Sequence, residues 1–274
     1  MLTLRILLCF ALCATGQQVR FHTIPDAVVE GRLERIGKDN AERAERLAAL
    51  FQEAGCGEPN LAREKAKGSK LPNITCVLTA GPEAEVIVVS AHYDKVRAGA
   101  GALDNWSGAA LLPSLYQSVA GSQDRKYTYL FIGFSDEEAG LIGAKAWVAE
   151  NRKGMLPRVR ALVNLDCIGA GPLYLWDTRA DKELGNVARR IGASISYPIH
   201  GVSADAVGDS DATPFRLQKI PTIDFHSLDN EKILILHTID DQLSVVDREH
   251  YRKSYRFLAI YLRYLDQLLA PRKQ

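Results

Sequence analysis

The sequence predicts a single α/β domain built on a largely parallel sheet. Short apolar runs of strand length alternate along the chain with segments whose apolar residues recur at helical spacing, a pattern typical of parallel sheets with crossover helices. The chain has 274 residues, of which 47% are hydrophobic, so one large core can form. Internal repeats and low-complexity tracts are absent from the sequence after residue 16, which favours one folded unit over residues 17–274.

The first 16 residues have the features of a signal peptide. Arg5 precedes an apolar run, Ile6 to Ala14, that is too short to span a bilayer. The small residues Ala14 and Gly16 suit the two small positions that precede a signal-peptidase cleavage site. We therefore expect residues 17–274 to form the mature domain, without a membrane anchor, in a secreted or periplasmic location.

The secondary structure can be predicted element by element. The first helix, Asn40 to Ala54, carries apolar residues at helical spacing and is followed by Gly55, a natural helix end. The polar stretch from Arg63 to Lys70 is predicted to be a surface loop. Beyond it, five apolar runs predict strands and four periodic segments predict helices. The strands are Val86–Ser90, Tyr127–Phe134, Arg160–Leu165, Leu173–Trp176 and Pro221–Phe225, and the helices are Ser107–Val119, Gly140–Glu150, Lys182–Ile191 and Asp247–Leu269.

The charge of the chain is balanced. Lysine and arginine total 34 against 33 acidic residues, which gives a formal net charge of +1. A protein that binds a polyanion normally shows an excess of clustered basic residues, and this sequence has none. We therefore expect no nucleic-acid partner.

Three cysteines remain after residue 16, and we expect two of them to form a disulfide. An oxidising compartment permits such a bond, and Cys56 and Cys76 are the expected pair. Cys56 follows the helix end at Gly55 and Cys76 is expected to begin a strand, whereas Cys167 lies in an apolar strand. The alternative is three buried free thiols, because a sequence does not report Cα separations.

Metal-binding residue types gather at the carboxyl ends of the predicted strands, where open α/β sheets bind their ligands. His92 and Asp166 end two apolar runs, and Glu138 closely follows a third. Imidazole and carboxylate groups suit zinc, and three carboxylates with one hydroxide balance the charge of two zinc ions. The candidate metal ligands are His92, Asp104, Glu138, Asp166 and His237.

Five short motifs together resemble the M28 zinc aminopeptidases. They are HYD at 92–94, LDNWSG from Leu103, DEE at 136–138, NLD at 164–166 and HTIDD from His237. Each motif is weak alone, but all five occur in the same order over nearly the whole of residues 17–274. The resemblance implies a three-layer αβα zinc-exopeptidase fold of the phosphorylase/hydrolase-like type, with a mostly parallel mixed sheet. It also implies an aminopeptidase that acts on peptides with a free N-terminus.

The resemblance assigns a role to each candidate ligand. It implies that His92 and Asp166 hold one zinc ion, that Glu138 and His237 hold a second, and that Asp104 bridges the two. A cis peptide between Asp104 and Asn105 is implied as well.

Three further carboxylates are expected to assist these ligands. Neighbouring residues in an extended segment point in different directions, so Glu137 can act as the general base while Glu138 binds metal. Asp94 is expected to accept the second N–H of His92 and to fix its tautomer, and Asp241 is expected to support His237 in the same way. The alternative for Asp94 and Asp241 is an ordinary carboxylate without a role.

Two rival functions stay open at this point. Glutaminyl cyclases share a similar set of motifs but bind a single zinc ion. They differ from this chain in two ways: they carry a tryptophan at the position of Leu236, and they have an insert after the glutamate pair. The other rival is a non-catalytic relative that serves as a binding domain. One departure concerns specificity: a histidine common to both enzyme groups is replaced by Ala212, in the loop from Ser210 to Phe215. Asp211 and Phe215 still match, so this loop is expected to wall the substrate pocket.

Overall fold

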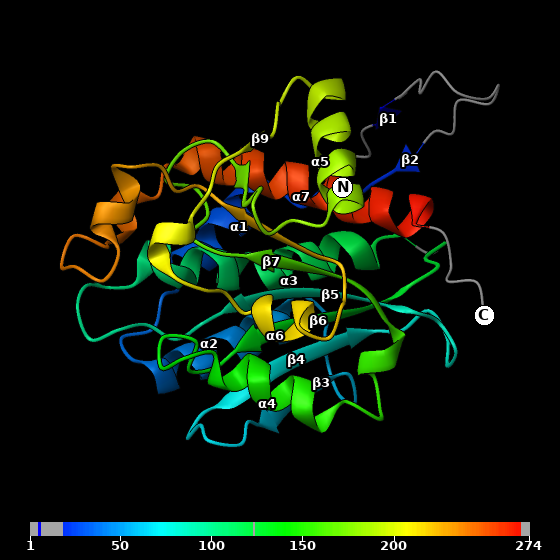
Figure 1. Cartoon of the computed structure of the whole chain (residues 1–274), viewed down its shortest axis with the longest axis horizontal. Coiled ribbons are helices and arrows are strands. Elements are labelled where there is room, and N and C mark those ends of the chain that lie inside the picture. Colours follow the sequence, from blue (N-terminus) through cyan, green and yellow to red (C-terminus); the bar gives the residue numbers. More distant parts are fainter. Residues whose placement is uncertain (1–4, 7–18, 123, 270–274) are drawn as a thin grey trace.

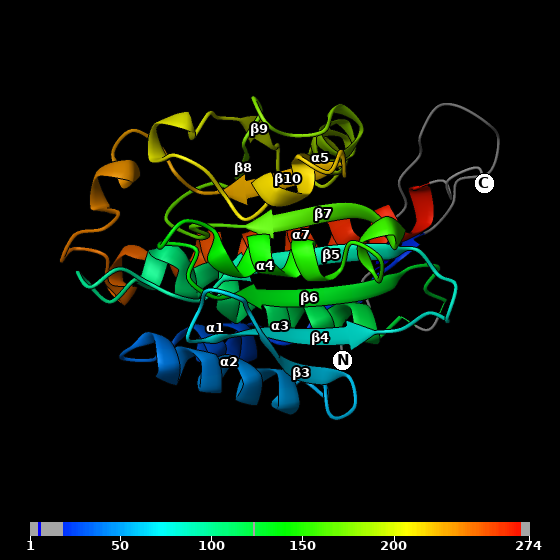
Figure 2. The ribbon, with the colours of Figure 1, turned by 60° about the horizontal axis from the view of Figure 1, so that its bottom comes forward.

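The computed structural model of the chain describes residues 5–6, 19–122 and 124–269. Its centre is an eight-stranded mixed sheet with helices on both faces (Figure 1; Figure 2). The predicted signal peptide, residues 1–16, lies outside the described residues except for the two-residue strand β1 (Arg5–Ile6). That strand pairs antiparallel with β2 (Val19–Arg20).

The strands of the main sheet follow the order β3-β4-β6-β5-β7-β10-β8-β9. The four central strands β6, β5, β7 and β10 run parallel, whereas β4 pairs antiparallel with β6 and β8 pairs antiparallel with β10. The sheet is therefore mixed and mostly parallel at its centre, as predicted. The bounds are β3 Leu61–Lys65, β4 Pro72–Leu78, β5 Val86–His92, β6 Thr128–Phe134, β7 Val159–Leu165, β8 Tyr174–Leu175, β9 His200–Gly201 and β10 Thr222–His226.

Helices cover both faces of the sheet and complete three layers. The larger core cluster lies between the sheet and α1 (Asp26–Leu33), α2 (Asn40–Glu53), α3 (Ser107–Ala120), α5 (Lys182–Ser194) and α7 (Arg248–Leu268). A second cluster lies on the opposite face, beneath α4 (Ile142–Glu150) and α6 (Thr213–Arg216). Shorter helical turns are η1 Ala102–Trp106, η2 Leu156–Arg158, η3 Asp205–Val207, η4 Lys232–Ile235 and η5 Leu243–Val245. In the described parts of the chain, no helix combines the length and apolar character needed to cross a membrane.

The predicted strands and helices are all present, and one predicted loop is wrong. Arg63 to Lys65, placed in a loop by the sequence, form the end of β3, which pairs with β4 as an antiparallel hairpin. The error has a physical reason: β3 lies at the edge of the sheet, and after Leu61 it alternates partly buried with exposed charged residues. It therefore lacks the apolar run of a central strand. Helix α1 was not predicted either.

Cys56 and Cys76 form the predicted disulfide, with their Cα atoms 6.4 Å apart. Cys76 lies inside β4 rather than at its start, and Cys167 is a buried free thiol. The bond ties the segment after α2 to the hairpin at the edge of the sheet. It therefore closes a loop between residues 20 positions apart.

Removing this disulfide is expected to destabilise the domain measurably. A loop of this length corresponds to about 3 kcal/mol of restricted unfolded-state entropy. Urea unfolding should therefore show a double variant, Cys56→Ala with Cys76→Ala, to be less stable by about that amount. A reducing agent should destabilise the wild type but leave the double variant unchanged. Equal stability of the two proteins without reductant would contradict the expectation.

Asp247 caps the first turn of α7, and its contribution should depend on pH. Its side chain accepts a hydrogen bond of 2.8 Å from the amide of His250, and this bond lowers the pKa of Asp247 below its usual 3.8. The stabilisation is therefore complete above the unfolded value and is lost as the pH falls through the folded pKa. Asp247→Ala should lower the free energy of unfolding by about 1 kcal/mol at neutral pH. In urea titrations the difference should vanish in acid. Asp247→Asn keeps an acceptor oxygen that does not titrate, so it should be close to the wild type at neutral pH and should lack the acid-dependent loss.

Candidate metal centre

The parallel strands bring the candidate residues to one edge of the sheet. His92 is the last residue of β5, and Asp166 directly follows β7, which is the neighbour of β5. The Glu137–Glu138 pair follows β6, the other neighbour of β5. Because neighbouring parallel strands end at the same edge, three segments far apart in the sequence meet there.

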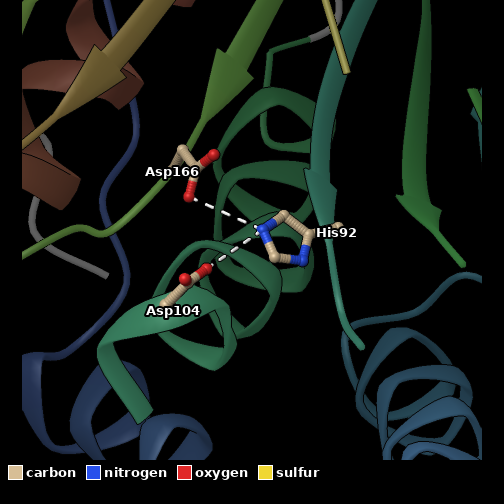
Figure 3. A group of neighbouring side chains, drawn as sticks. All are labelled: His92, Asp104 and Asp166. Atoms are coloured by element: carbon tan, nitrogen blue, oxygen red, sulfur yellow. Dashed lines mark ion pairs between the residues drawn. The ribbon is translucent and has the colours of Figure 1, made fainter. Parts of the chain in front are cut away.

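A first group of ligand atoms lies around His92. Its Nε2 atom is 3.2 Å from Oδ1 of Asp104 and 3.6 Å from Oδ1 of Asp166 (Figure 3). The imidazole and the Asp104 side chain are almost completely buried, whereas the Asp166 side chain is 24% exposed. One imidazole nitrogen and two carboxylates therefore converge on one point that solvent can reach from one side.

A second group shares Asp104 with the first. The Nε2 atom of His237 lies 3.3 Å from Oδ2 of Asp104 and 2.8 Å from Oε2 of Glu138. The two oxygens of Asp104 thus face different histidines, which is the geometry of a bridging carboxylate. The His237 side chain is 55% exposed, so this group lies at the mouth of the site.

The loop that carries Asp104 is held in place from the far end of the sequence. The carboxylate of Asp241 accepts hydrogen bonds from the amides of Leu103, at 2.7 Å, and Asp104, at 3.1 Å. The peptide bond between Asp104 and Asn105 is cis, as the resemblance implied. The expectation that Asp241 supports His237 is therefore corrected: its carboxylate is committed to the backbone of the Asp104 loop.

Asp94 contacts both His92 and the glutamate pair. Its Oδ1 atom lies 3.5 Å from Nδ1 of His92, a polar contact whose alignment falls short of a hydrogen bond. The same carboxylate accepts hydrogen bonds from the amides of Glu137, at 3.0 Å, and Glu138, at 3.2 Å. Asp94 is 2% exposed, so it is a buried link between two segments of the site, not a surface carboxylate.

The pKa shifts show that the site favours positive charge. Burial alone would raise the pKa of Asp104, but hydrogen bonds with His237 and His92 hold it well below the usual range. Burial would lower the pKa of His92, yet the charge of Glu137 and the contact with Asp104 raise it well above the usual value. The pKa of His237 rises to about 9, chiefly through Asp104. Carboxylates packed this closely stabilise a nearby cation.

The two glutamates have raised pKa values. Burial raises the pKa of Glu137 to about 9, reinforced by the charges of Asp211 and Asp166 and opposed by His92. Burial also raises the pKa of Glu138 to about 7, reinforced by Asp104. Both shifts arise because several carboxylates share one buried site, an arrangement in which a bound cation would stabilise the charged forms.

A cavity opens beside these groups. Trp176, Ser210 and His226 lie in its wall. Trp176 was not predicted as a pocket residue, and its position at the end of a predicted strand was the available signal. His226 is fixed by hydrogen bonds, because its Nε2 lies 3.1 Å from the carbonyl of Val202 and its Nδ1 accepts the amide of Leu228. The lining comprises His92, Asp104, Glu137, Glu138, Asp166, Cys167, Trp176, Ala204, Asp209, Ser210, Asp224, Phe225, His226, Leu228, Leu236 and His237.

Asp211, Ala212 and Phe215 follow Ser210 in this loop, and they are buried and do not line the cavity. Phe215 stacks on Trp147 in the core beneath α4, and Ala212 belongs to the same core cluster. Asp211 is 1% exposed, and among the described residues neither of its carboxylate oxygens has a hydrogen-bond partner. The loop therefore borders the cavity through Asp209 and Ser210, as expected, whereas Asp211, Ala212 and Phe215 do not line it.

The donor set and its spacing suit zinc. Each group offers three ligand atoms within 4.8 Å of one another: His92, Asp104 and Asp166 in one, and Asp104, Glu138 and His237 in the other. Imidazole nitrogen and carboxylate oxygen are common zinc ligands in catalytic sites. The buried Oε1 atom of Glu138 has no hydrogen-bond partner among the described residues, so it remains available to a cation.

Known sequences match this chain over its catalytic part. The sequence model described as Peptidase family M28 matches residues 73–262. Leupeptin-inactivating enzyme 1 of Streptomyces exfoliatus is 32% identical over 145 residues, which cover 52% of this chain and 32% of that protein. Aminopeptidase YwaD of Bacillus subtilis is 26% identical over 178 residues, which cover 62% and 39%. The match therefore spans less than half the length of these relatives.

Solved structures share the fold. The LapA aminopeptidase of Legionella pneumophila aligns with a TM-score of 0.79 at 20% identity, covering 90% of this chain and 73% of that one. BSAP, a zinc aminopeptidase from Bacillus subtilis, aligns with a TM-score of 0.62 at 24% identity, covering 70% and 49%. The glutaminyl cyclase of Porphyromonas gingivalis aligns with a TM-score of 0.67 at 18% identity, covering 86% and 96%. The same architecture thus occurs in peptidases and in a cyclase.

Proposed function

Because the chain belongs to peptidase family M28, we propose that it is a zinc-dependent aminopeptidase that hydrolyses the N-terminal bond of peptides. The observation that carries this proposal is the position of Asp104, whose two carboxylate oxygens face His92 and His237 separately. His92, Asp104 and Asp166 would hold one zinc ion, and Asp104, Glu138 and His237 would hold a second. When bound, zinc lowers the pKa of a coordinated water and polarises a carbonyl group.

Glu137 is the proposed general base. It lines the same cavity as the ligand groups, so its carboxylate is placed to take a proton from the attacking water and to pass it to the leaving amine. Asp94 would position this base, because it holds the amides of Glu137 and Glu138 while its Oδ1 lies beside the imidazole of His92. The chain thus divides proton transfer and metal binding between adjacent glutamates.

The lining of the cavity supports a substrate with a free N-terminus. Asp209 places a carboxylate in the wall that is neither a proposed zinc ligand nor the proposed base, and it would attract a protonated α-amino group. Leu228 and Leu236 add apolar surface, which favours an apolar first residue. We further propose that residues 1–16 are removed as a signal peptide and that the enzyme acts outside the cytoplasm.

Glutaminyl cyclisation is the second candidate, because the Porphyromonas gingivalis glutaminyl cyclase has the same fold. Two observations favour hydrolysis. Leu236 occupies the position before His237, where cyclases carry tryptophan, and only three residues separate Glu138 from the start of α4 at Ile142. The departure at Ala212 now bears less on specificity, because that residue lies in the core.

One pair of measurements tests the proposed function. Zinc content per chain should approach two, and the protein should release nitroaniline from aminoacyl-nitroanilides without cyclising an N-terminal glutaminyl peptide. Cyclisation without hydrolysis, with one zinc per chain, would instead establish the cyclase. Zinc binding without either reaction would point to a non-catalytic relative.

A further inference from the structure

Arg43 is a completely buried arginine near the candidate metal centre. It lies in the first turns of α2 and is 0% exposed. It also lies outside residues 73–262, the part of the chain that matches the family model. Burial of a guanidinium group is costly unless its donors are paired, so the contacts of Arg43 need an explanation.

The guanidinium of Arg43 binds the backbone on both sides of the ligand-bearing loop. It donates a 3.0 Å hydrogen bond to the carbonyl of Tyr93, which directly follows His92. A second nitrogen donates to the carbonyls of Ala100 and Gly101, the latter at 2.8 Å, just before the η1 turn that carries Asp104. One rigid guanidinium group, a planar fork of donors, therefore binds the backbone near both ends of the segment between His92 and Asp104.

Asn40 and Gly101 also take part in these contacts between α2 and the loop. Asn40, on the same helix, exchanges hydrogen bonds with the backbone of Lys95, at 3.0 and 3.2 Å, inside the same loop. Gly101 has a positive φ of 60°, and a Cβ there would lie 2.6 Å from Cβ of Lys95, 2.9 Å from the carbonyl oxygen of Asp104 and 3.0 Å from a guanidinium nitrogen of Arg43. The tight packing of the loop, with Arg43 as one of its contacts, thus requires glycine at position 101.

The charge of Arg43 acts on the site without a direct ion pair. The described residues offer it no carboxylate within ion-pair distance, and its donors go to carbonyl groups. Burial lowers the pKa of Arg43 to about 10, but the carboxylates Asp241, Asp94, Asp104 and Glu138 oppose the shift. The group therefore stays protonated at neutral pH and faces the same carboxylates that surround the proposed metal ions.

We propose that Arg43 is a positioning residue of the metal centre, whose buried fork holds the backbone that carries His92, Asp94 and Asp104. This inference rests on the proposed zinc site. Groups that orient metal ligands typically contribute 10- to 100-fold to metal affinity. Loss of the fork would leave the carbonyls of Tyr93 and Ala100 without this donor, while Gly101 would keep only the amide of Trp106. The loop would be freed, so the ligands would no longer be held in place.

Zinc affinity of the purified chain, measured by competition with a chromophoric chelator, tests this role. Arg43→Met should bind zinc about 10- to 100-fold more weakly. Arg43→Lys keeps the charge but has a single nitrogen in place of the fork, so its affinity should fall between those of Arg43→Met and the wild type. Arg32→Met is the matched control, because Arg32 is also buried but bonds Ser114 and Gln117 on α3. It should lower the unfolding temperature and leave zinc affinity unchanged.

The outcomes separate this inference from the proposed function. A wild-type chain that binds no zinc would overturn the proposed function itself. If the wild type binds zinc and Arg43→Met binds it equally well, or if Arg32→Met weakens binding as much, the positioning role is wrong. Should Arg43→Met fail to fold, Arg43→Lys decides: zinc affinity equal to the wild type would show that the hydrogen-bonding fork is not required.

Discussion

Glu137→Gln is expected to reduce kcat about 100- to 10,000-fold while zinc content stays at the wild-type level. The amide has the shape of the carboxylate but cannot accept the proton of the attacking water. The hydrogen bond from this position to Asp94 uses the backbone amide, so the substitution leaves that contact intact. Steady-state hydrolysis of an aminoacyl-nitroanilide, together with metal analysis of the same sample, measures both quantities.

A neighbouring carboxylate provides the control for this variant. Asp136 lies in the same turn, is partly exposed and has a φ of 50°, a conformation that asparagine tolerates. Asp136→Asn makes the same change of charge one residue away and should leave kcat close to the wild type. Wild-type activity of Glu137→Gln would show that another group moves the proton. Loss of zinc from Glu137→Gln would make Glu137 a ligand instead of a base.

Asp104→Ala is expected to lose zinc from both ligand groups, because each group uses one oxygen of this carboxylate. The loss of affinity should exceed the 10- to 100-fold effect typical of residues that only orient ligands. Metal analysis after gel filtration should then show nearly metal-free protein, and hydrolysis should be lost with the metal. Circular dichroism checks that the variant keeps its fold, since Asp104 is a buried residue.

Asp240 offers a matched control for Asp104→Ala. It is exposed and lies in the same HTIDD motif as His237, so Asp240→Ala removes a nearby carboxylate without touching either ligand group. Its zinc content should equal that of the wild type. If Asp104→Ala retained one zinc ion with unchanged affinity, Asp104 would belong to a single group and the proposed bridge would be wrong.

The positions of His92 and Asp166 could be predicted because strand ends are visible in a sequence. Runs of apolar residues mark buried parallel strands, and parallel neighbours end at a common edge. The same pattern did not reveal β3, because its exposed face carries charged residues at the sheet edge. Local hydrophobicity therefore predicts central elements better than peripheral ones.

The residues that hold the backbone of the site in place could not be predicted from local sequence patterns. Asp241 lies four residues after His237 in the sequence, yet its carboxylate binds the amides of Leu103 and Asp104. Arg43 looks like an ordinary charged residue of an amphipathic helix, but it is completely buried. Closeness in sequence says little about where a side chain points once loops fold over one another.

The sequence by itself determined the fold class, the family and the residue types of the candidate site. These depend on periodicity and on short motifs, which are local properties of the chain. Only the tertiary structure decided which oxygen of Asp104 faces which histidine, what Asp94 and Asp241 hold, and that Arg43 lies beneath the loop. Such relations depend on distances between remote segments and on burial, which exist only after the chain has folded.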